Sequence, residues 1–318
     1  MSRQYHQLQR RFAWSWWRPL AGVVLVLLLV LVVQVAAVLV VSAYLAATGT
    51  PVAEVTSTLS GDRLTPGFLA AINLGWALCI PAVWLIAYLV HRMRPGWVAS
   101  VGPRIRWRWF AASLGVALVT LVVTLLVSGA LAGFLPADEA ATGTGGGGLN
   151  DFTSTSRDFL LVIVLLTPLQ AAGEEYAFRG YLTQALGGLF SGARASAVVA
   201  VAMPATLFAL AHGLGQDPSV FFDRLAFGLI AGTLVILTGG LEAGIALHVL
   251  NNWFAFGLAL FFGDIAGALE PSGGGWARIV ITLVQSLTFL GLALVVSRRM
   301  GLRTRAGQSG LEPARTPV

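Results

Sequence analysis

The sequence predicts an all-α, polytopic membrane protein with eight transmembrane helices and both termini in the cytoplasm. Hydrophobic residues make up 57% of the 318 positions and charged residues only 11%, whereas a soluble domain carries about 25% charged residues. Eight apolar segments are near or above the roughly 20 residues that a helix needs to cross the hydrocarbon. Most arginines lie in the loops of one side, as is typical of cytoplasmic loops.

The first apolar segment runs from Leu20 to Val41 and is interrupted only by Gln34. The apolar core of a secretory signal is about 7–15 residues long, so this longer segment is predicted to be a retained transmembrane helix. Residues 1–19 before it combine arginine with tryptophan, which is typical of an interfacial segment on the cytoplasmic side. The other expected spans cover residues 67–90, 109–135, 158–186, 195–213, 219–238, 241–262 and 277–297.

The loop arginines predict the orientation of these spans. With the N-terminus inside, the outer loops hold only Arg63, Arg157 and Arg278. The cytoplasmic segments hold Arg3, Arg10, Arg11, Arg18, Arg92, Arg94, Arg104, Arg106, Arg108, Arg194, Arg298, Arg299, Arg303, Arg305 and Arg315. Cytoplasmic loops carry an excess of Lys and Arg, so both termini are expected in the cytoplasm. The net charge of +6 follows from this topology, and we expect membrane lipid as a partner but no nucleic acid.

The loop over residues 136–157 separates the first three spans from the fourth. It contains the run Gly-Thr-Gly-Gly-Gly-Gly at 143–148, which predicts a flexible connection. We find no soluble domain and no internal repeat in the sequence. It therefore predicts three parts: a cytoplasmic N-terminal segment over 1–19, a single transmembrane helical domain over 20–297 whose motif-bearing core covers about 158–262, and a flexible cytoplasmic tail over 298–318.

Some residues with reactive side chains have simple structural explanations. Cys79 is the single cysteine and lies in an apolar segment, so it can form neither a disulfide framework nor a thiolate metal site. We expect it to be a small buried hydrophobe. His6 and His91 lie in basic segments, where we expect both to be solvated at the surface. The chemistry is therefore expected from other positions, inside the spans.

The fourth span carries charges within the stretch from Thr167 to Leu182, which reads TPLQAAGEEYAFRGYL. An ionised side chain at the centre of a membrane costs about 2.5–3.5 kcal/mol on insertion scales, so such a residue indicates function by default. Glu175 and Arg179 are four residues apart and share a helix face, where they can pair. Glu174 points about 100° away from that face. It is left without a local partner and needs a functional explanation.

Two later spans each carry one polar cluster. His212 follows Phe208 by four residues, and Asn252 follows His248 by four residues, so each pair shares a helix face. Polar groups at lipid depth must find partners inside the bundle. We therefore expect Glu174, His212, His248 and Asn252 to converge on one polar cavity.

Each cluster also has a structural alternative when it is taken alone. A membrane histidine or Asn252 can join helices by hydrogen bonds, and Glu175 with Arg179 can be a structural ion pair. For the whole chain, the alternative is a membrane transporter or a non-catalytic membrane scaffold. Intramembrane charges and helices interrupted at Pro168 and Pro204 support that alternative. The lack of paired broken segments and of repeat symmetry in the sequence argues against it.

Taken together, a glutamate, two histidines and an asparagine suffice to hydrolyse an amide bond. The carboxylate, assisted by a histidine, takes a proton from water, and a second histidine and an amide donate to the developing oxyanion. Alternatively, Glu174, His212 and His248 supply three zinc ligands with an open fourth position. The metal-free mechanism is favoured, and zinc stays the alternative cofactor. The sequence lacks the His-Glu-x-x-His helix of zinc proteases.

The three motifs together resemble those of a known family. Glu174-Glu175-x-x-x-Arg179, Phe208-x-x-x-His212 and His248-x-x-x-Asn252 are similar to the motif set of the CAAX protease and bacteriocin-processing (CPBP, or Abi) family, which includes the Ras-converting CAAX endopeptidases. The resemblance covers residues 160–260 and implies an α-helical intramembrane endopeptidase. It also implies roles by position: Glu174 and His212 activate water, His248 and Asn252 form the oxyanion site, and Glu175, Arg179 and Phe208 support them.

The resemblance leaves the substrate open beyond a peptide or protein. Eukaryotic relatives cut prenylated C-terminal motifs, whereas prokaryotic relatives are linked to peptide processing or bacteriocin self-immunity. All basic residues of this chain are arginine and the chain is rich in alanine, which indicates a bacterial plasma membrane as its location. Prenylated CAAX substrates are not expected there. The oligomeric state does not follow from the sequence.

Overall fold

The computed structural model describes residues 3–60, 63–132, 148–213, 215–265 and 277–307, and this part of the chain is almost entirely helical. It contains eight helices that are long and apolar enough to cross a membrane. The all-α, eight-span prediction is therefore confirmed. The cytoplasmic placement of the termini stays a prediction.

The elements follow one another along the chain with these bounds. The N-terminal half contains β1 (Arg3–Gln4), the 3₁₀ helix η1 (Tyr5–Arg11), α1 (Trp17–Ala47), α2 (Val52–Ser60), α3 (Pro66–His91), α4 (Gly96–Ala99) and α5 (Trp107–Ala132). The C-terminal half contains α7 (Ser154–Leu165), α8 (Thr167–Glu175), the π-helical turn η2 (Tyr176–Leu182), α9 (Thr183–Leu189), α10 (Ala193–Ala211), α11 (Pro218–Thr238), α12 (Glu242–Phe262), α13 (Ala277–Arg299) and β2 (Arg305–Ala306).

Several helix ends have clear local causes. Thr65 caps α3 by accepting a hydrogen bond from the backbone N–H of Phe68, and a proline follows it at the first helical position. Thr153 and Ser156 form a reciprocal capping box at the start of α7. Gly239 ends α11 with φ of 73°, a left-handed conformation that glycine adopts without strain.

Two spans differ from their expected bounds. The fourth span is one long run over residues 154–189, made of α7, α8, η2 and α9, and so exceeds the expected 158–186. The fifth span ends at Ala211, so His212 is its C-terminal cap and not a residue within it. Its backbone N–H still donates to the carbonyls of Ala209 and Leu210, and its side chain lies at the helix end.

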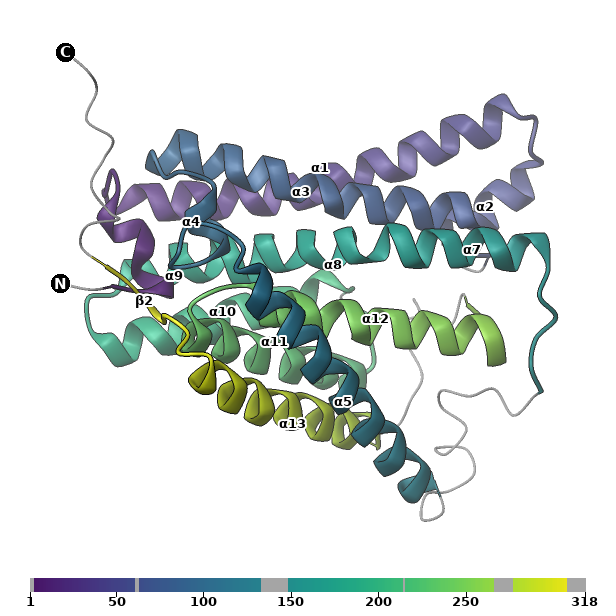
Figure 1. Ribbon diagram of the computed structural model, residues 1–318. Coiled ribbons are helices and arrows are strands. Elements are labelled where there is room, and N and C mark those ends of the chain that lie inside the picture. Colours follow the sequence, from purple (N-terminus) through teal and green to yellow (C-terminus); the bar gives the residue numbers. More distant parts are fainter. Residues whose placement is uncertain (1–2, 61–62, 133–147, 214, 266–276, 308–318) are drawn as a thin grey trace.

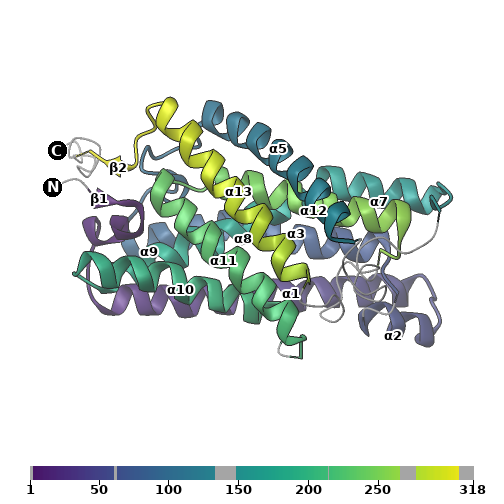
Figure 2. The ribbon, with the colours of Figure 1, turned by 90° about the horizontal axis from the view of Figure 1, so that it is seen from below.

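The fourth span lies at the centre of the bundle. α8 contacts α3 on one side and α12 on another, and η2 contacts α3 and α10 (Figure 1). α11 and α13 cover the face that is seen from below (Figure 2). A Cβ atom at Gly173 would overlap the backbone carbonyl oxygen of Trp76, so this glycine lets α8 and α3 meet backbone to backbone. The residue after it is Glu174, which the close contact places inside the protein.

Both termini lie at one end of the bundle, where β1 pairs antiparallel with β2 (Figure 1). Tyr5 and Leu8 of η1 are fully buried, and the Tyr5 hydroxyl donates a hydrogen bond to the Val98 carbonyl. The segment expected to be a flexible tail thus begins with ordered residues up to 307, and its remainder lies outside the described residues. Most of the glycine run at 143–148 also lies outside them.

The expectation that His6 and His91 are solvated is wrong, because both are fully buried. His91 ends α3 and hydrogen-bonds through Nε2 to the Tyr181 hydroxyl at 2.8 Å. His6 packs against α9, where a Cβ atom at Gly187 would lie 2.6 Å from the His6 carbonyl oxygen. The basic neighbours in the sequence suggested a solvated segment, but the segment folds back onto the bundle. Cys79 is buried as expected.

His6 generates a prediction about pH. Neither of its ring nitrogens has a hydrogen-bond partner among the described residues, and burial lowers its pKa to about 4. The unfolded chain binds this proton near the usual pKa of about 6.5, so stability is present above that value and is lost as the pH falls toward 4. When the pH falls from about 7 to about 4.5, the unfolding free energy of the wild type should decrease by roughly 2 kcal/mol more than that of His6→Phe, which has no imidazole to protonate. Thermal unfolding in detergent measures this difference, and parallel pH profiles would contradict it.

Candidate active site

One carboxylate oxygen of Glu175 joins the fourth span to the seventh. Glu175 Oε1 lies 3.2 Å from Arg179 Nη1 and 3.0 Å from His248 Nδ1. Glu175 and Arg179 are 0% and 1% exposed, so the pair predicted from their spacing is confirmed and is deeply buried. The turn that carries Arg179 is the π-helical η2. Such turns occur frequently at functional sites because they redirect side chains within a helix.

The Arg179 guanidinium is surrounded by aromatic rings. Its Cζ lies 3.9 Å from the ring centroid of Phe208 and 5.5 Å from that of Phe227. Its three side-chain nitrogens make no hydrogen bond of good geometry within the described residues, so the ion pair with Glu175 and the two π faces are its compensation. Phe208 thus supports the cluster through its ring.

Glu174 has a local partner that the sequence-based prediction missed. Gln170 lies one turn earlier on the same helix face, and its side-chain amide donates a hydrogen bond to Glu174 Oε1. The other oxygen, Glu174 Oε2, lies 3.8 Å from His248 Nε2 and has no hydrogen-bond partner among the described residues. Glu174 is 3% exposed. Glu175 Oε2 also lacks a hydrogen-bond partner among the described residues, but it lies against Gly244. Of these two buried carboxylate oxygens, that of Glu174 is the one beside the Nε2 atom of His248.

Gln170 also binds the second helix of the site. Asn252 Nδ2 donates a hydrogen bond to Gln170 Oε1 at 3.0 Å. The side chains therefore form a continuous chain from Asn252 through Gln170, Glu174, His248 and Glu175 to Arg179. The signal for Gln170 was present in the sequence, as a polar residue four positions before Glu174 inside an apolar span.

α12 can approach the glutamates because it carries a glycine one turn before His248. A Cβ atom at Gly244 would lie 2.9 Å from Glu175 Oε2, so a larger residue would push the helix away. His248 then lies between the two carboxylates, with Nδ1 facing Glu175 and Nε2 facing Glu174. Its ring edge contacts Phe227 at a centroid distance of 5.2 Å.

His212 lies beside this chain of contacts but is not joined to it by a hydrogen bond within the described residues. Its Nδ1 lies 2.8 Å from the Phe208 carbonyl oxygen. A carbonyl can only accept, so Nδ1 carries the hydrogen and Nε2 is the acceptor of the neutral ring. Phe208 lies between the histidines, at centroid distances of 4.6 Å from His212 and 6.1 Å from His248. His212 is half-buried at the end of α10.

The structure thus brings Glu174, Glu175, Arg179, His248 and Asn252 into direct or bridged contact, with His212 one aromatic ring away. No three His, Cys, Asp or Glu side chains are grouped as metal ligands within the described ranges. The zinc arrangement of Glu174, His212 and His248 is therefore not formed in this conformation. Carboxylates, an imidazole and amide groups gathered in one buried cluster are a set suited to proton transfer and oxyanion binding.

Comparison with known proteins finds a family match over the residues of this site. Residues 156–254 match the family model described as Type II CAAX prenyl endopeptidase Rce1-like. The match begins in α7, ends in α12 and includes every residue of the cluster. The chain is also similar to the uncharacterized protein YyaK of Bacillus subtilis (strain 168), with 25% identity over 234 residues, which covers 69% of this chain and 72% of YyaK. No solved structure gives a significant match.

The shared carboxylate of Glu175 generates a stability prediction. Glu175→Gln removes the carboxylate charge that pairs with Arg179 at 3.2 Å, and breaking a buried pair in this way costs about 3–5 kcal/mol. The matched control is Glu54→Gln, which breaks the Glu54–Arg63 pair, whose side chains are 50% and 57% exposed, and should cost at most about 1 kcal/mol. Thermal unfolding of both variants in detergent tests this, and equal losses would contradict the structural role of Glu175.

Proposed function

We propose that this protein is a CAAX-type intramembrane endopeptidase that hydrolyses a peptide bond, because residues 156–254 match the Rce1-like family model. The observation that carries the proposal is the free oxygen of Glu174, buried among polar groups from two spans. Glu175 Oε2 is also unpartnered, but the charge of Glu175 is held by Arg179 and by His248. Glu174 has no arginine partner within hydrogen-bond distance among the described residues, and its unpartnered oxygen lies 3.8 Å from His248 Nε2. A general base needs such an oxygen, available to take a proton.

In the proposed reaction Glu174 takes a proton from water, and His212 assists. The side of His212 that faces away from Phe208 presents Nε2 as an acceptor, because Nδ1 is committed to a carbonyl. Its half-buried position at the end of α10 allows water to reach it. The two bases approach the water from different helices, which fixes the direction of its attack on the substrate carbonyl.

The hydroxide adds to the substrate carbonyl, and His248 and Asn252 then bind the oxyanion that forms. When this intermediate collapses, the C–N bond breaks and the leaving amine takes the proton that Glu174 removed from water. Asn252 donates one amide hydrogen to Gln170 and keeps a second for the oxyanion. His248 donates from Nε2 when both ring nitrogens are protonated. In that state His248 and Arg179 balance the charges of Glu174 and Glu175, so the buried cluster is neutral as a whole. Glu175 holds His248 in place through Nδ1.

The substrate in this proposal is a peptide or protein segment that reaches the site from the membrane. The eight apolar spans make the protein a multi-pass membrane protein, and we assign it to the bacterial plasma membrane from its composition. A farnesylated CAAX peptide is the natural first probe, because the matched family is named for prenyl CAAX endopeptidases. The membrane proteome of the host is the second probe and requires no assumption about the lipid.

Removal of the free carboxylate oxygen should abolish cleavage without unfolding the protein. Glu174→Gln keeps the shape of the side chain but removes the base, so hydrolysis should fall by at least about 10²-fold, within the range expected for general-base catalysis. Cleavage is followed on an internally quenched farnesylated CAAX peptide and by mass spectrometry of peptides released from membranes. A transporter or scaffold would show the same peptide pattern for wild type and Glu174→Gln, and that result would reject the proposal.

Gln170 should act as a positioning residue for both halves of the site. Gln170→Leu removes the hydrogen bonds to Glu174 and Asn252 together, and misplacement of such groups by about 1 Å costs roughly 10²-fold in rate. We expect kcat to fall while KM stays nearly constant. The matched control is Gln34→Leu, a half-buried glutamine of α1, which should leave both constants unchanged. A rise in KM with kcat unchanged would show that Gln170 contacts substrate and does not position the catalytic groups.

A further inference from the structure

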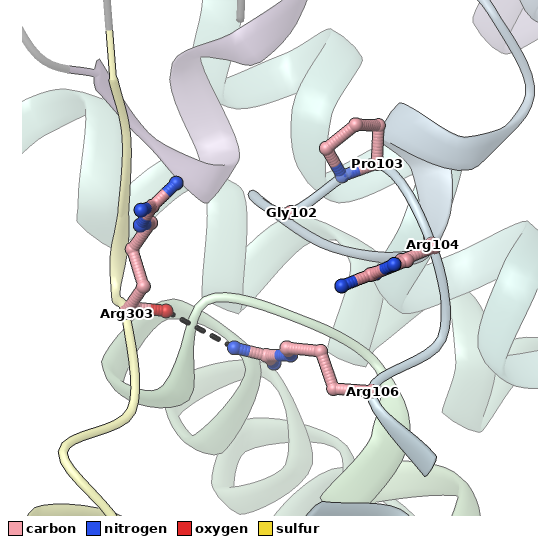
Figure 3. Close-up of a pocket in the computed structure, with 5 residues that line it drawn as sticks. All are labelled: Gly102, Pro103, Arg104, Arg106 and Arg303. Atoms are coloured by element: carbon pink, nitrogen blue, oxygen red, sulfur yellow. Dashed lines mark hydrogen bonds between the residues drawn. The ribbon is translucent and has the colours of Figure 1, made fainter.

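A second site lies at the end of the bundle that carries the termini. It is a pocket of about 460 Å³ lined by Gly102, Pro103, Arg104, Arg106 and Arg303. It contains none of the candidate active-site residues, so it is a separate feature of the molecule. Three of its five lining residues are arginines, and they come from the loop before α5 and from the segment after α13 (Figure 3).

Arg106 forms the fixed floor of this pocket. Its Nε and Nη2 donate to the two oxygens of Glu242 at 2.8 and 2.6 Å, and Nη1 donates to the carbonyls of Thr238 and Arg303 at 3.0 Å each. Glu242 is fully buried. All three nitrogens of Arg106 are therefore engaged by the protein itself, and its charge is balanced. Any ligand must be bound by the remaining two arginines.

Arg104 and Arg303 carry uncompensated charge. Both side chains are exposed, and no carboxylate pairs with either of them within the described parts of the chain. The side chains of Arg104 and Arg106 reach toward the segment that holds Arg303, on the other side of the pocket (Figure 3). The Ser100 hydroxyl donates to the Arg104 carbonyl at 2.7 Å and so holds the loop closed. Two free guanidinium groups on opposite walls are suited to one anion with several acceptor oxygens, such as a phosphate.

The position of the pocket points to a lipid as the source of that anion. Residues 102–106 lie just before the span of α5, and Arg303 lies just after the span of α13. Trp107, the next residue, is 70% exposed, and exposed tryptophans mark the headgroup level of a membrane. Trp16 and Trp17 are also exposed at the start of α1. Basic pockets between spans at this level bind the headgroups of anionic lipids.

We propose that this pocket binds the phosphate of an anionic membrane lipid between Arg104 and Arg303. The ligand lies over Arg106 and therefore over the joint between α11 and α12, because Arg106 holds Thr238 at the end of one helix and Glu242 at the start of the other. The bound lipid ties the segment after α13 to the loop before α5. It stabilises the folded protein in proportion to its occupancy.

The test measures thermal unfolding of the full-length protein in a neutral detergent as lipid is added. Phosphatidylglycerol should raise the unfolding temperature of the wild type, and phosphatidylcholine with the same acyl chains should not. In the double variant Arg104→Gln/Arg303→Gln, apparent affinity for phosphatidylglycerol should fall about 30-fold, from about 5-fold per arginine near an anionic surface. The control Arg94→Gln/Arg194→Gln removes two exposed arginines that do not line the pocket and should keep the wild-type response.

Three outcomes would overturn the proposal. Equal responses of the double variant and the wild type would show that the pocket does not bind the lipid. Equal stabilisation by phosphatidylcholine would show that the effect does not depend on the charge of the headgroup. Equal stabilisation by inorganic phosphate at the same concentration would assign the pocket to a soluble anion.

A second measurement does not depend on how well the double variant folds. Trp107 directly follows the pocket residue Arg106 in the chain and its side chain is 70% exposed, so a lipid bound in the pocket should quench its fluorescence when the lipid carries bromine. Wild type minus Trp107→Phe isolates this signal. Brominated phosphatidylglycerol should quench it more than brominated phosphatidylcholine, and equal quenching counts against the site.

Discussion

The arrangement of the core depends on how charge is accommodated inside an apolar bundle. Glu175 is fully buried, and it is held by one cation on its own helix and by an imidazole on α12. The buried Arg179 charge in turn needs a carboxylate at the same depth, and Glu175 supplies it. This constraint requires α8, η2 and α12 to meet at one point. The glycines at 173 and 244 serve the same requirement, since each lets a helix approach a glutamate or a neighbouring backbone.

α12 is held in position at three levels. At its start, Glu242 pairs with Arg106 at 2.6 Å. Two turns later, His248 bonds to Glu175, and near the middle Trp253 donates from Nε1 to the Ile163 carbonyl of α7 at 2.9 Å. A helix fixed in this way presents His248 and Asn252 with little freedom to move. Rigid placement of this kind is what oxyanion donors require, because reorganisation during a reaction reduces their contribution.

The two ends of the site differ in how firmly they are held. Glu174, His248 and Asn252 belong to a continuous chain of polar contacts through Gln170. His212 is the cap of α10 and reaches the others only through the ring of Phe208. In the proposed reaction the general base and the oxyanion donors are thus held by many contacts, whereas the second base lies at a half-buried helix end.

The fold class, the eight spans and the pairing of Glu175 with Arg179 could be predicted from the sequence, because they follow from local quantities: apolar length, charge content and helical spacing. Glu174, His248 and Asn252 could be singled out as well, since polar groups at membrane depth need partners. Which partners they took depends on how the helices pack and became known only from the structure. Gln170 and Glu174 lie on one helix face, but a spacing of four residues is too common to predict a hydrogen bond between them. The hydrogen bond from Asn252 to Gln170 depends on how α12 packs against α8. The burial of His6 was decided in the same way, by a terminal segment that folds back onto α9, which no local pattern encodes.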